Sequence, residues 1–232
     1  MTQTPMIDFY ERERTQGGYS IFNTTGNHKI NVYYKIELDG GGTTFGQDYL
    51  PVLANKYPGR MFNRAYEWCS GPGFIGFSLL SHGVCKTLCL SDLYDPSITA
   101  AEVTINYEPN VCNKLVTTYL CKDIGLIPKH EKFDLVVANP PHFNDFNGIP
   151  QNDYTGIRIS KDINWRAHTN FFNNIKQHLT PDGVILLQEH IHGAKLQDLI
   201  GMIQQNELQV TDRFDSPNVN ENAMYYIEIK HI

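Results

Sequence analysis

The sequence lacks the features that mark a membrane or secreted protein. None of its apolar runs approaches the ~20 residues that a membrane-spanning helix needs. The first residues, MTQTPMIDFYERER, contain no apolar core of a signal peptide. Internal repeats and low-complexity tracts are absent as well. We therefore expect a cytoplasmic protein that does not use a membrane.

Cysteine and histidine form no pattern typical of a metal site. The five cysteines are odd in number and include no C-x-x-C pair: Cys69, Cys85, Cys89, Cys112 and Cys121. This favours buried thiols in a reducing cytosol over disulfides or zinc. The second half of the chain contains His168, His178, His190 and His192. The run from Glu189 to His192 is short and has no third partner, so we interpret it as a polar strand end and predict no metal.

The chain also lacks an excess of positive charge. Its formal net charge is −6. Residues 1–66 contain seven Lys/Arg and six Asp/Glu, whereas the rest of the chain contains twelve and nineteen. A protein that grips many phosphates is usually basic, so we do not expect binding to long duplex DNA.

What is present supports one domain with a hydrophobic core. A length of 232 residues, 41% of them hydrophobic and 12% aromatic, suits a single domain with a small appendage. We expect a small N-terminal extension over residues 1–60, with a strand or hairpin, and the main domain over 61–232. The first thirty residues are polar and are expected to be irregular. A strand is expected over 31–39, closed by the loop that follows Asp39.

From residue 62 onward, short apolar segments alternate with helical ones. Strands are expected over 64–69, 86–92, 115–123, 133–139 and 184–190, and helices over 73–83, 97–108, 165–179 and 194–206. Residues 180–183, TPDG, are expected to stop the third helix. Two strands over 208–214 and 224–230 have no helix between them. The pattern predicts an α/β fold with a seven-stranded, mostly parallel sheet, helices on both faces and an antiparallel C-terminal hairpin.

The first strand of this alternation ends in a glycine-rich turn. Glu67 precedes Gly71 and Gly73, which allow a ligand to approach the backbone and the N-terminus of the next helix. Such a turn is weak evidence alone, because tight turns and other nucleotide sites share it. Glu67 is more informative, since a cationic ligand head attracts a carboxylate that nicotinamide-dependent oxidoreductases normally lack there.

The next three strand ends are also polar. Asp92 can accept both hydroxyls of a ribose, or it can be a helix cap or turn residue. Asp123 and Ile124 can bind an adenine amino group and cover the ring, or they can form an ordinary turn. The fourth strand ends in Asn139 and two prolines, which either stop the strand or form a rigid clamp. Four such ends in succession are more specific than any one of them.

Taken together, the segments EWCSGPGFIG, LSDLYD, CKDIG and FDLVVANPPHF resemble the successive motifs of class I S-adenosylmethionine-dependent methyltransferases. The last segment is similar to the N/D-P-P-Y/F motif of the amino-methylating branch, whose members act on adenine N6, guanine N2 or protein glutamine N5. The resemblance covers roughly residues 62–230 in order and spacing. It implies a Rossmann-like methyltransferase domain with S-adenosyl-L-methionine as cofactor.

The resemblance also implies which residues hold the cofactor. Glu67, Gly71 and Gly73 line its methionine end, Asp92 and Leu93 its ribose, and Asp123 and Ile124 its adenine. Cys69 lies in the glycine-rich turn where glycine is usual, and as a small residue it should preserve cofactor binding. Phe45, in TTFGQDYLPVL, loosely matches a residue that such enzymes often place over the cofactor. Asn139 is expected to contact both cofactor and substrate.

The asparagine-proline motif suits methylation of a planar nitrogen. An amide or exocyclic amino nitrogen is a poor nucleophile because its lone pair is delocalised. Two acceptors, the Asn139 side-chain oxygen and the Pro140 carbonyl, can hold its hydrogens so that the lone pair faces the methyl donor. The prolines fix this geometry, so catalysis rests on preorganised positioning.

The substrate-binding residues are expected to be Pro141, His142 and Phe143. His142 stands where the resembled motif has Tyr or Phe, and an imidazole adds a titrating, hydrogen-bonding edge. Stacking on the substrate is then the role either of His142 or of Phe143.

The sequence leaves two alternatives and several partners open. A non-catalytic S-adenosylmethionine-binding scaffold subunit is one alternative, although the complete motif at Asn139 argues against it. A nicotinamide oxidoreductase is the other, and Glu67 together with the terminal hairpin argues against that. The substrate is expected to be a protein glutamine or an unstacked base in structured RNA. A small activating partner subunit is compatible with this class.

Overall fold

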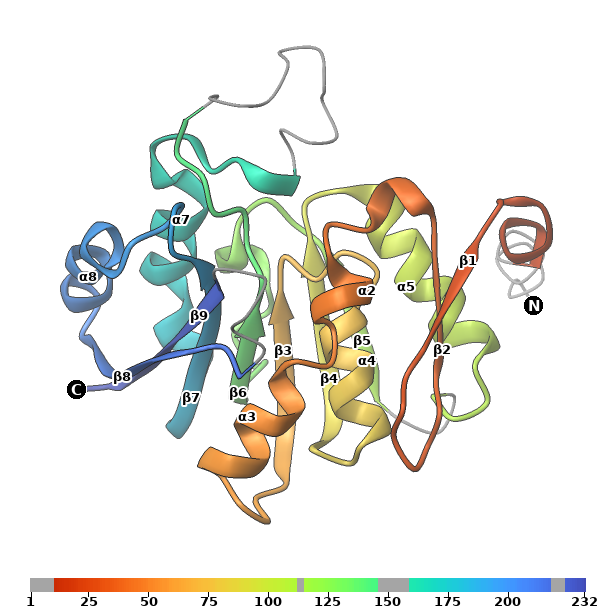
Figure 1. Cartoon of the computed structure of the whole chain (residues 1–232), viewed down its shortest axis with the longest axis horizontal. Helices are drawn as coiled ribbons and strands as arrows, with labels where there is room; N and C mark the ends of the chain where they lie inside the picture. Colours follow the sequence, from red (N-terminus) through yellow and green to blue (C-terminus); the bar gives the residue numbers. More distant parts are fainter. Residues whose placement is uncertain (1–10, 112–114, 146–158, 218–223) are drawn as a thin grey trace.

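The computed structural model describes residues 11–111, 115–145, 159–217 and 224–232. In these ranges a seven-stranded sheet has the order β5-β4-β3-β6-β7-β9-β8 (Figure 1). Its strands are β3 (Phe62–Trp68), β4 (Cys85–Asp92), β5 (Val116–Leu120), β6 (Phe133–Ala138), β7 (Leu179–His190), β8 (Leu208–Asp215) and β9 (Met224–His231). Strand β9 runs opposite to the other six strands of this sheet and pairs antiparallel with both β7 and β8. The predicted fold class is confirmed, with the antiparallel strand lying one place inside the edge that β8 forms.

Helices cover both faces of the sheet. One face packs against α3 (Tyr49–Lys56), α4 (Phe74–Ser81) and α5 (Asp95–Tyr107). The other packs against η2 (Ile124–Leu126), α7 (Arg166–Ile175) and α8 (Leu196–Gln205). Successive strand residues alternate between the two cores: Ala65 and Leu135 belong to the first, and Tyr66 and Val136 to the second. Both faces of the strands are therefore apolar, as a sheet covered on both sides requires.

The N-terminal part contains more regular structure than expected. Residues 11–16 are helical, and β1 (Ser20–Asn23) pairs antiparallel with β2 (Asn31–Tyr34) beside α5 (Figure 1). The expectation of thirty irregular residues is thus wrong for this segment. The expected strand over 31–39 ends early, because Ile36–Leu38 form the 3₁₀ helix η1. The short helix α2 (Gly42–Phe45) follows.

The connection from α7 to β7 also differs from the prediction. The α-helix ends at Ile175 and continues as the 3₁₀ helix η4 (Lys176–His178), while η3 (Ile163–Trp165) precedes it. Residues 180–183 lie inside β7 rather than stopping the helix. They are an irregularity in the ladder, which pairs Phe133 with Leu179 and then Leu135 with Val184. The backbone resumes regular pairing after this insertion.

No helix in the described ranges is both long enough and apolar enough to cross a membrane.

Candidate functional site

A cavity of about 200 Å³ lies at the carboxyl ends of β3, β4 and β6. Strands β3 and β6 are neighbours in the sheet, but the chain leaves β3 toward β4 on the other side. This is the switch point at which open α/β sheets bind ligands. The lining residues that the sequence singled out are Phe45, Glu67, Cys69, Gly71, Asp92, Leu93, Asn139, Pro140, Pro141 and His142.

Four predicted site residues do not line this cavity: Gly73, Asp123, Ile124 and Phe143. Gly73 is the N-cap of α4, with a φ of 91°. Asp123 accepts hydrogen bonds at its Oδ1 from the Gly125 backbone nitrogen at 2.7 Å and from the Asn174 amide at 3.3 Å. Ile124 is buried in the core on the α7 side. Asp123 and Ile124 thus form the cap and the anchor of η2, and their expected adenine contact is not supported by the cavity lining.

The turn after β3 explains its glycine-rich sequence. Cys69 has a φ of 52°, a left-handed conformation that non-glycine residues seldom adopt. Glycine adopts this conformation without steric cost, so a glycine would fit the backbone at Cys69. Gly71 has the same φ of 52°, and a Cβ atom there would have no neighbour within 4 Å. The backbone at Gly71 is therefore open to the cavity.

Glu67 is a buried carboxyl group at the floor of the cavity. It is 2% exposed, and its Oε2 accepts a hydrogen bond of 2.7 Å from the Gly76 backbone nitrogen in α4. Burial raises its pKa to about 8, although the backbone N–H groups of Gly76 and Ile75 oppose the shift. A cationic group in the cavity would favour the ionised form of this carboxyl group.

Asp92 connects the turns after β3 and β4. Its Oδ2 accepts a hydrogen bond from the Gly71 backbone nitrogen at 2.9 Å, and its Oδ1 accepts one from Tyr94 at 2.8 Å. A carboxylate oxygen can accept more than one hydrogen bond, and Asp92 also lines the cavity. Asp92 is thus both a turn residue and a candidate ribose acceptor.

A tyrosine from the N-terminal part secures the strand end before Asn139. Tyr49 of α3 is fully buried, and its hydroxyl donates toward the carbonyls of Ala138 (2.6 Å) and Leu186 (3.1 Å). The Ala138 nitrogen faces the same hydroxyl at 3.3 Å. The Tyr49 hydroxyl therefore ties β6 to β7 one residue before the asparagine-proline motif.

His142 lies between Asn139 and a buried carboxylate. Its Nε2 is 2.8 Å from Asn139 Oδ1, and its Nδ1 is 2.8 Å from Glu189 Oε2. The other oxygen of Glu189 is 3.0 Å from His168 Nε2. His168 Nδ1 is in turn 2.6 Å from Asp162 Oδ2. We call Asn139, His142, Glu189, His168 and Asp162 the buried relay.

Charge within the buried relay is partly compensated. Burial disfavours protonation of His168, but attraction to Glu189 and hydrogen bonds to both carboxylates outweigh it and raise the His168 pKa to about 9. The pKa of Glu189 is lowered, because its attraction to His168 and its bonds to both histidines exceed the effect of burial. The pKa of Asp162 is lowered for a similar reason. At neutral pH, His168 is therefore a cation between two carboxylates.

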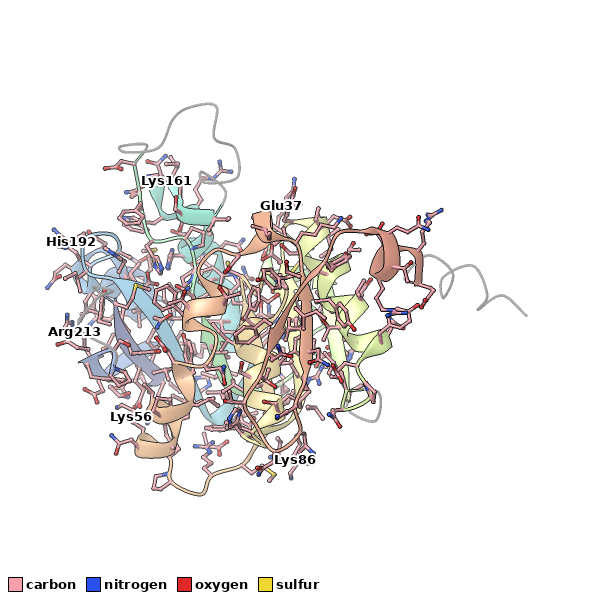
Figure 2. The ribbon with its side chains drawn as sticks, turned by 45° about the vertical axis from the view of Figure 1, so that its right-hand side comes forward. Glu37, Lys56, Lys86, Lys161, His192 and Arg213 are labelled. Carbon is pink, nitrogen blue, oxygen red and sulfur yellow. The ribbon has the colours of Figure 1, made fainter. Side chains whose placement is uncertain are left out.

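Phe143 points into a different environment. Its backbone pairs with the segment around Lys161, through hydrogen bonds with Ser160 and Asp162. The Lys161 ammonium lies 5.0 Å from the centre of the Phe143 ring. Lys161 and His192 lie on this same side of the molecule (Figure 2). The Phe143 backbone thus positions Asp162 of the buried relay. The Phe143 side chain does not line the main cavity, so the structure does not support its predicted stacking on a substrate there.

Sequence reasoning missed Tyr49, Asp162, His168 and Glu189 as contributors to this site. The signal in the sequence is the pair Glu189 and His190 at a strand end, which by itself indicates only a polar terminus. Among the described residues, no group of three or more His, Cys, Asp or Glu could hold a metal ion. The four described cysteines are free thiols, and Cys112 lies outside the described residues.

Comparison with known proteins identifies the fold. No protein-family model matches the sequence. A search of curated proteins finds no significant match either. Among solved structures, a ribosomal protein L11 methylase from Lactobacillus delbrueckii subsp. bulgaricus is 15% identical, with a TM-score of 0.53, over 80% of this chain and 77% of that chain.

Two further structures show the same fold. A glycopeptide N-methyltransferase complexed with S-adenosylmethionine is 12% identical, with a TM-score of 0.57, over 81% of this chain and 94% of its own. An O-methyltransferase of Brevibacillus brevis in complex with S-adenosyl-L-homocysteine is 12% identical, with a TM-score of 0.56, over 79% of this chain and 71% of that chain. The chain therefore shares the fold of methyltransferases that differ in their acceptor atoms.

Proposed function

We propose that this protein is an S-adenosylmethionine-dependent methyltransferase that acts on a planar amide or amino nitrogen. The observation that carries the proposal is the single cavity that joins Glu67, the open turn at Gly71, Asp92 and the Asn139-Pro140 motif. These residues come from three strand ends at the switch point of the sheet. The shared fold with solved methyltransferases supports the same assignment.

The residues present fit the cofactor. Glu67 offers a buried carboxyl group to a cationic amino end, Gly71 offers an open backbone, and Asp92 places a carboxylate on the cavity wall where ribose hydroxyls could donate to it. Bound S-adenosylmethionine would supply an electrophilic methyl group on a sulfonium. Asn139 and Pro140 lie in the same cavity, where their oxygens can orient the hydrogens of the acceptor nitrogen.

Calorimetry tests the cofactor assignment. Wild-type protein should bind S-adenosylmethionine in preference to NAD. Asp92→Asn should weaken binding by about 1–3 kcal/mol, roughly 5- to 150-fold, because a charged acceptor is lost. The matched control is Asp95→Asn, an exposed residue in the first turn of α5 that does not line the cavity. The control should bind within about twofold of wild type. Preference for NAD, or equal effects of the two substitutions, would refute the assignment.

The acceptor group is tested separately. Asn139→Ala should leave cofactor affinity nearly intact and abolish transfer, because its side-chain oxygen acts mainly on the substrate. The assay is incubation of cell extract with radiolabelled cofactor, followed by protease or nuclease digestion. Transfer at the wild-type rate in this variant would refute the clamp.

The same digestion assigns the substrate class. We propose a protein glutamine or a base in structured RNA, since the net charge of −6 does not suit long duplex DNA. Label found only in a small metabolite would contradict both choices.

A further inference from the structure

In the buried relay, the imidazole ring of His142 lies directly against Asn139, the residue proposed to orient the substrate nitrogen that accepts the methyl group. His142 Nε2 faces Asn139 Oδ1 at 2.8 Å, and the His142 side chain is 13% exposed at the cavity wall. An amide oxygen is a pure acceptor, so this contact requires a proton on Nε2. The protonation of the two His142 ring nitrogens therefore decides whether Asn139 directs its side-chain oxygen or its NH2 group toward the cavity.

The groups behind His142 determine its other proton. His168 is a cation between Asp162 and Glu189, so these three groups together carry one negative charge. Glu189 Oε2 faces His142 Nδ1 at 2.8 Å, and an ionised carboxylate can only accept. His142 Nδ1 therefore keeps its proton in both charge states of the ring. All loss and gain of a proton on His142 occurs at Nε2.

The two charge states of His142 require opposite orientations of the Asn139 amide. In the imidazolium form, Nε2 donates a hydrogen bond to Asn139 Oδ1, so this oxygen faces His142 and not the substrate. In the neutral form, Nε2 has a lone pair that would oppose the Oδ1 lone pairs. A rotation of the amide by 180° then lets Asn139 Nδ2 donate to Nε2 and releases Oδ1.

We propose that His142 is a positioning residue that sets the orientation of the Asn139 amide. Asn139 Oδ1 then faces the substrate nitrogen only when the His142 imidazole is neutral. The inference rests on the proposed function, because it gives the released oxygen its role in orienting an acceptor nitrogen. It also gives a physical reason for histidine at a position where the resembled motif has an aromatic ring. Methyl transfer would then be switched off by protonation of one side chain.

Several titratable groups surround His142 and act on this equilibrium. They are Glu189 and His190 from β7, His192 from the turn after it, His168 from α7, and Lys161 and Asp162 from the segment paired with Phe143. Glu189 hydrogen-bonds the His142 ring directly. The His190 ring is 6.3 Å away, centre to centre, and does not reach Asn139 by any hydrogen bond found among the described residues.

The turn at Gly193 holds His142 close to these partners. A Cβ atom at Gly193 would lie 2.4 Å from the His142 carbonyl oxygen and 2.9 Å from its Cβ. The backbone after β7 therefore approaches His142 as closely as glycine permits. This contact limits movement of the ring away from Asn139 and Glu189.

Nuclear magnetic resonance of the full-length, ¹⁵N-labelled protein tests the inference without a substrate. Above the His142 titration, we expect a proton on Nδ1 only, and a coupling through the hydrogen bond between Asn139 Nδ2 and His142 Nε2. Below the titration, that coupling should vanish. In His142→Phe the pH dependence of the Asn139 side-chain amide should be lost, and backbone resonances report whether the fold is kept.

The matched control is His190→Phe, which removes a neighbouring imidazole and should preserve the Asn139 titration. No coupling at either pH, or a proton on Nε2 in the neutral form, would overturn the inference. An Asn139 titration that survives in His142→Phe would overturn it as well. Calorimetry with S-adenosylmethionine on the same wild-type sample separates the two proposals. Absence of cofactor binding refutes the proposed function, whereas a missing coupling with normal binding refutes only the role of His142.

Discussion

Removal of the Tyr49 hydroxyl is expected to destabilise the strand end that carries Asn139. In Tyr49→Phe, the carbonyls of Ala138 and Leu186 lose the single hydroxyl proton that they share at 2.6 and 3.1 Å, and the Ala138 nitrogen loses its acceptor at 3.3 Å. The site is fully buried, so water does not replace the hydroxyl without disturbing the packing around it. At about 1 kcal/mol for the donated bond and about 1 kcal/mol for the bond accepted from the Ala138 nitrogen, the free energy of unfolding should fall by about 2 kcal/mol. For a chain of this length, that corresponds to a melting temperature lower by about 4–8 °C.

Urea denaturation is the suitable assay, because a lower midpoint with an unchanged slope reports stability alone. Tyr34→Phe provides a matched control. The Tyr34 ring packs edge-on against Phe74, and its hydroxyl makes no hydrogen bond to any residue that the structure describes. The control should change stability by less than about 0.5 kcal/mol. An equal midpoint for Tyr49→Phe and wild type would refute the idea that this hydroxyl ties β6 to β7.

Three further predictions concern the turn after β3 and its carboxyl group. Because the pKa of Glu67 is raised to about 8, this group is mostly protonated at pH 7. Binding of the cationic cofactor should therefore release close to one proton. Calorimetry at pH 7 in two buffers of different ionisation enthalpy measures this release, and identical heats in both buffers would contradict it. Without ligand, the same shift lowers folding stability as pH rises from 4.5 to 8, since only the unfolded chain ionises readily there. Gly73→Ala should destabilise the fold more than Gly71→Ala. Only at Gly73 would the new Cβ approach Leu90 and Phe77 to 2.9 Å. The difference should be about 1–3 kcal/mol by urea denaturation, and equal losses would show that steric crowding is not the cause.

Patterns along the chain were sufficient to predict the sheet and half of the site. Alternation of apolar strands with helices is a local property, because each strand must bury both faces and each helix one stripe. The turn with Glu67 and Gly71, the carboxylate of Asp92 and the motif at Asn139 each lie at a strand end. Parallel strands bring those ends to one edge, so their convergence on a cavity follows from the fold class.

Only the tertiary structure decided which neighbours these residues have. Tyr49 reaches Ala138 across 89 positions in sequence, and Glu189 reaches His142 across 47. No sequence period specifies such contacts, because they depend on how α3, β6 and β7 pack together. The same packing turns Phe143 toward Lys161 and leaves Asp123 capping η2, away from the cavity. The sequence by itself therefore determined where chemistry is available, and side-chain packing between distant segments decided which atoms face one another.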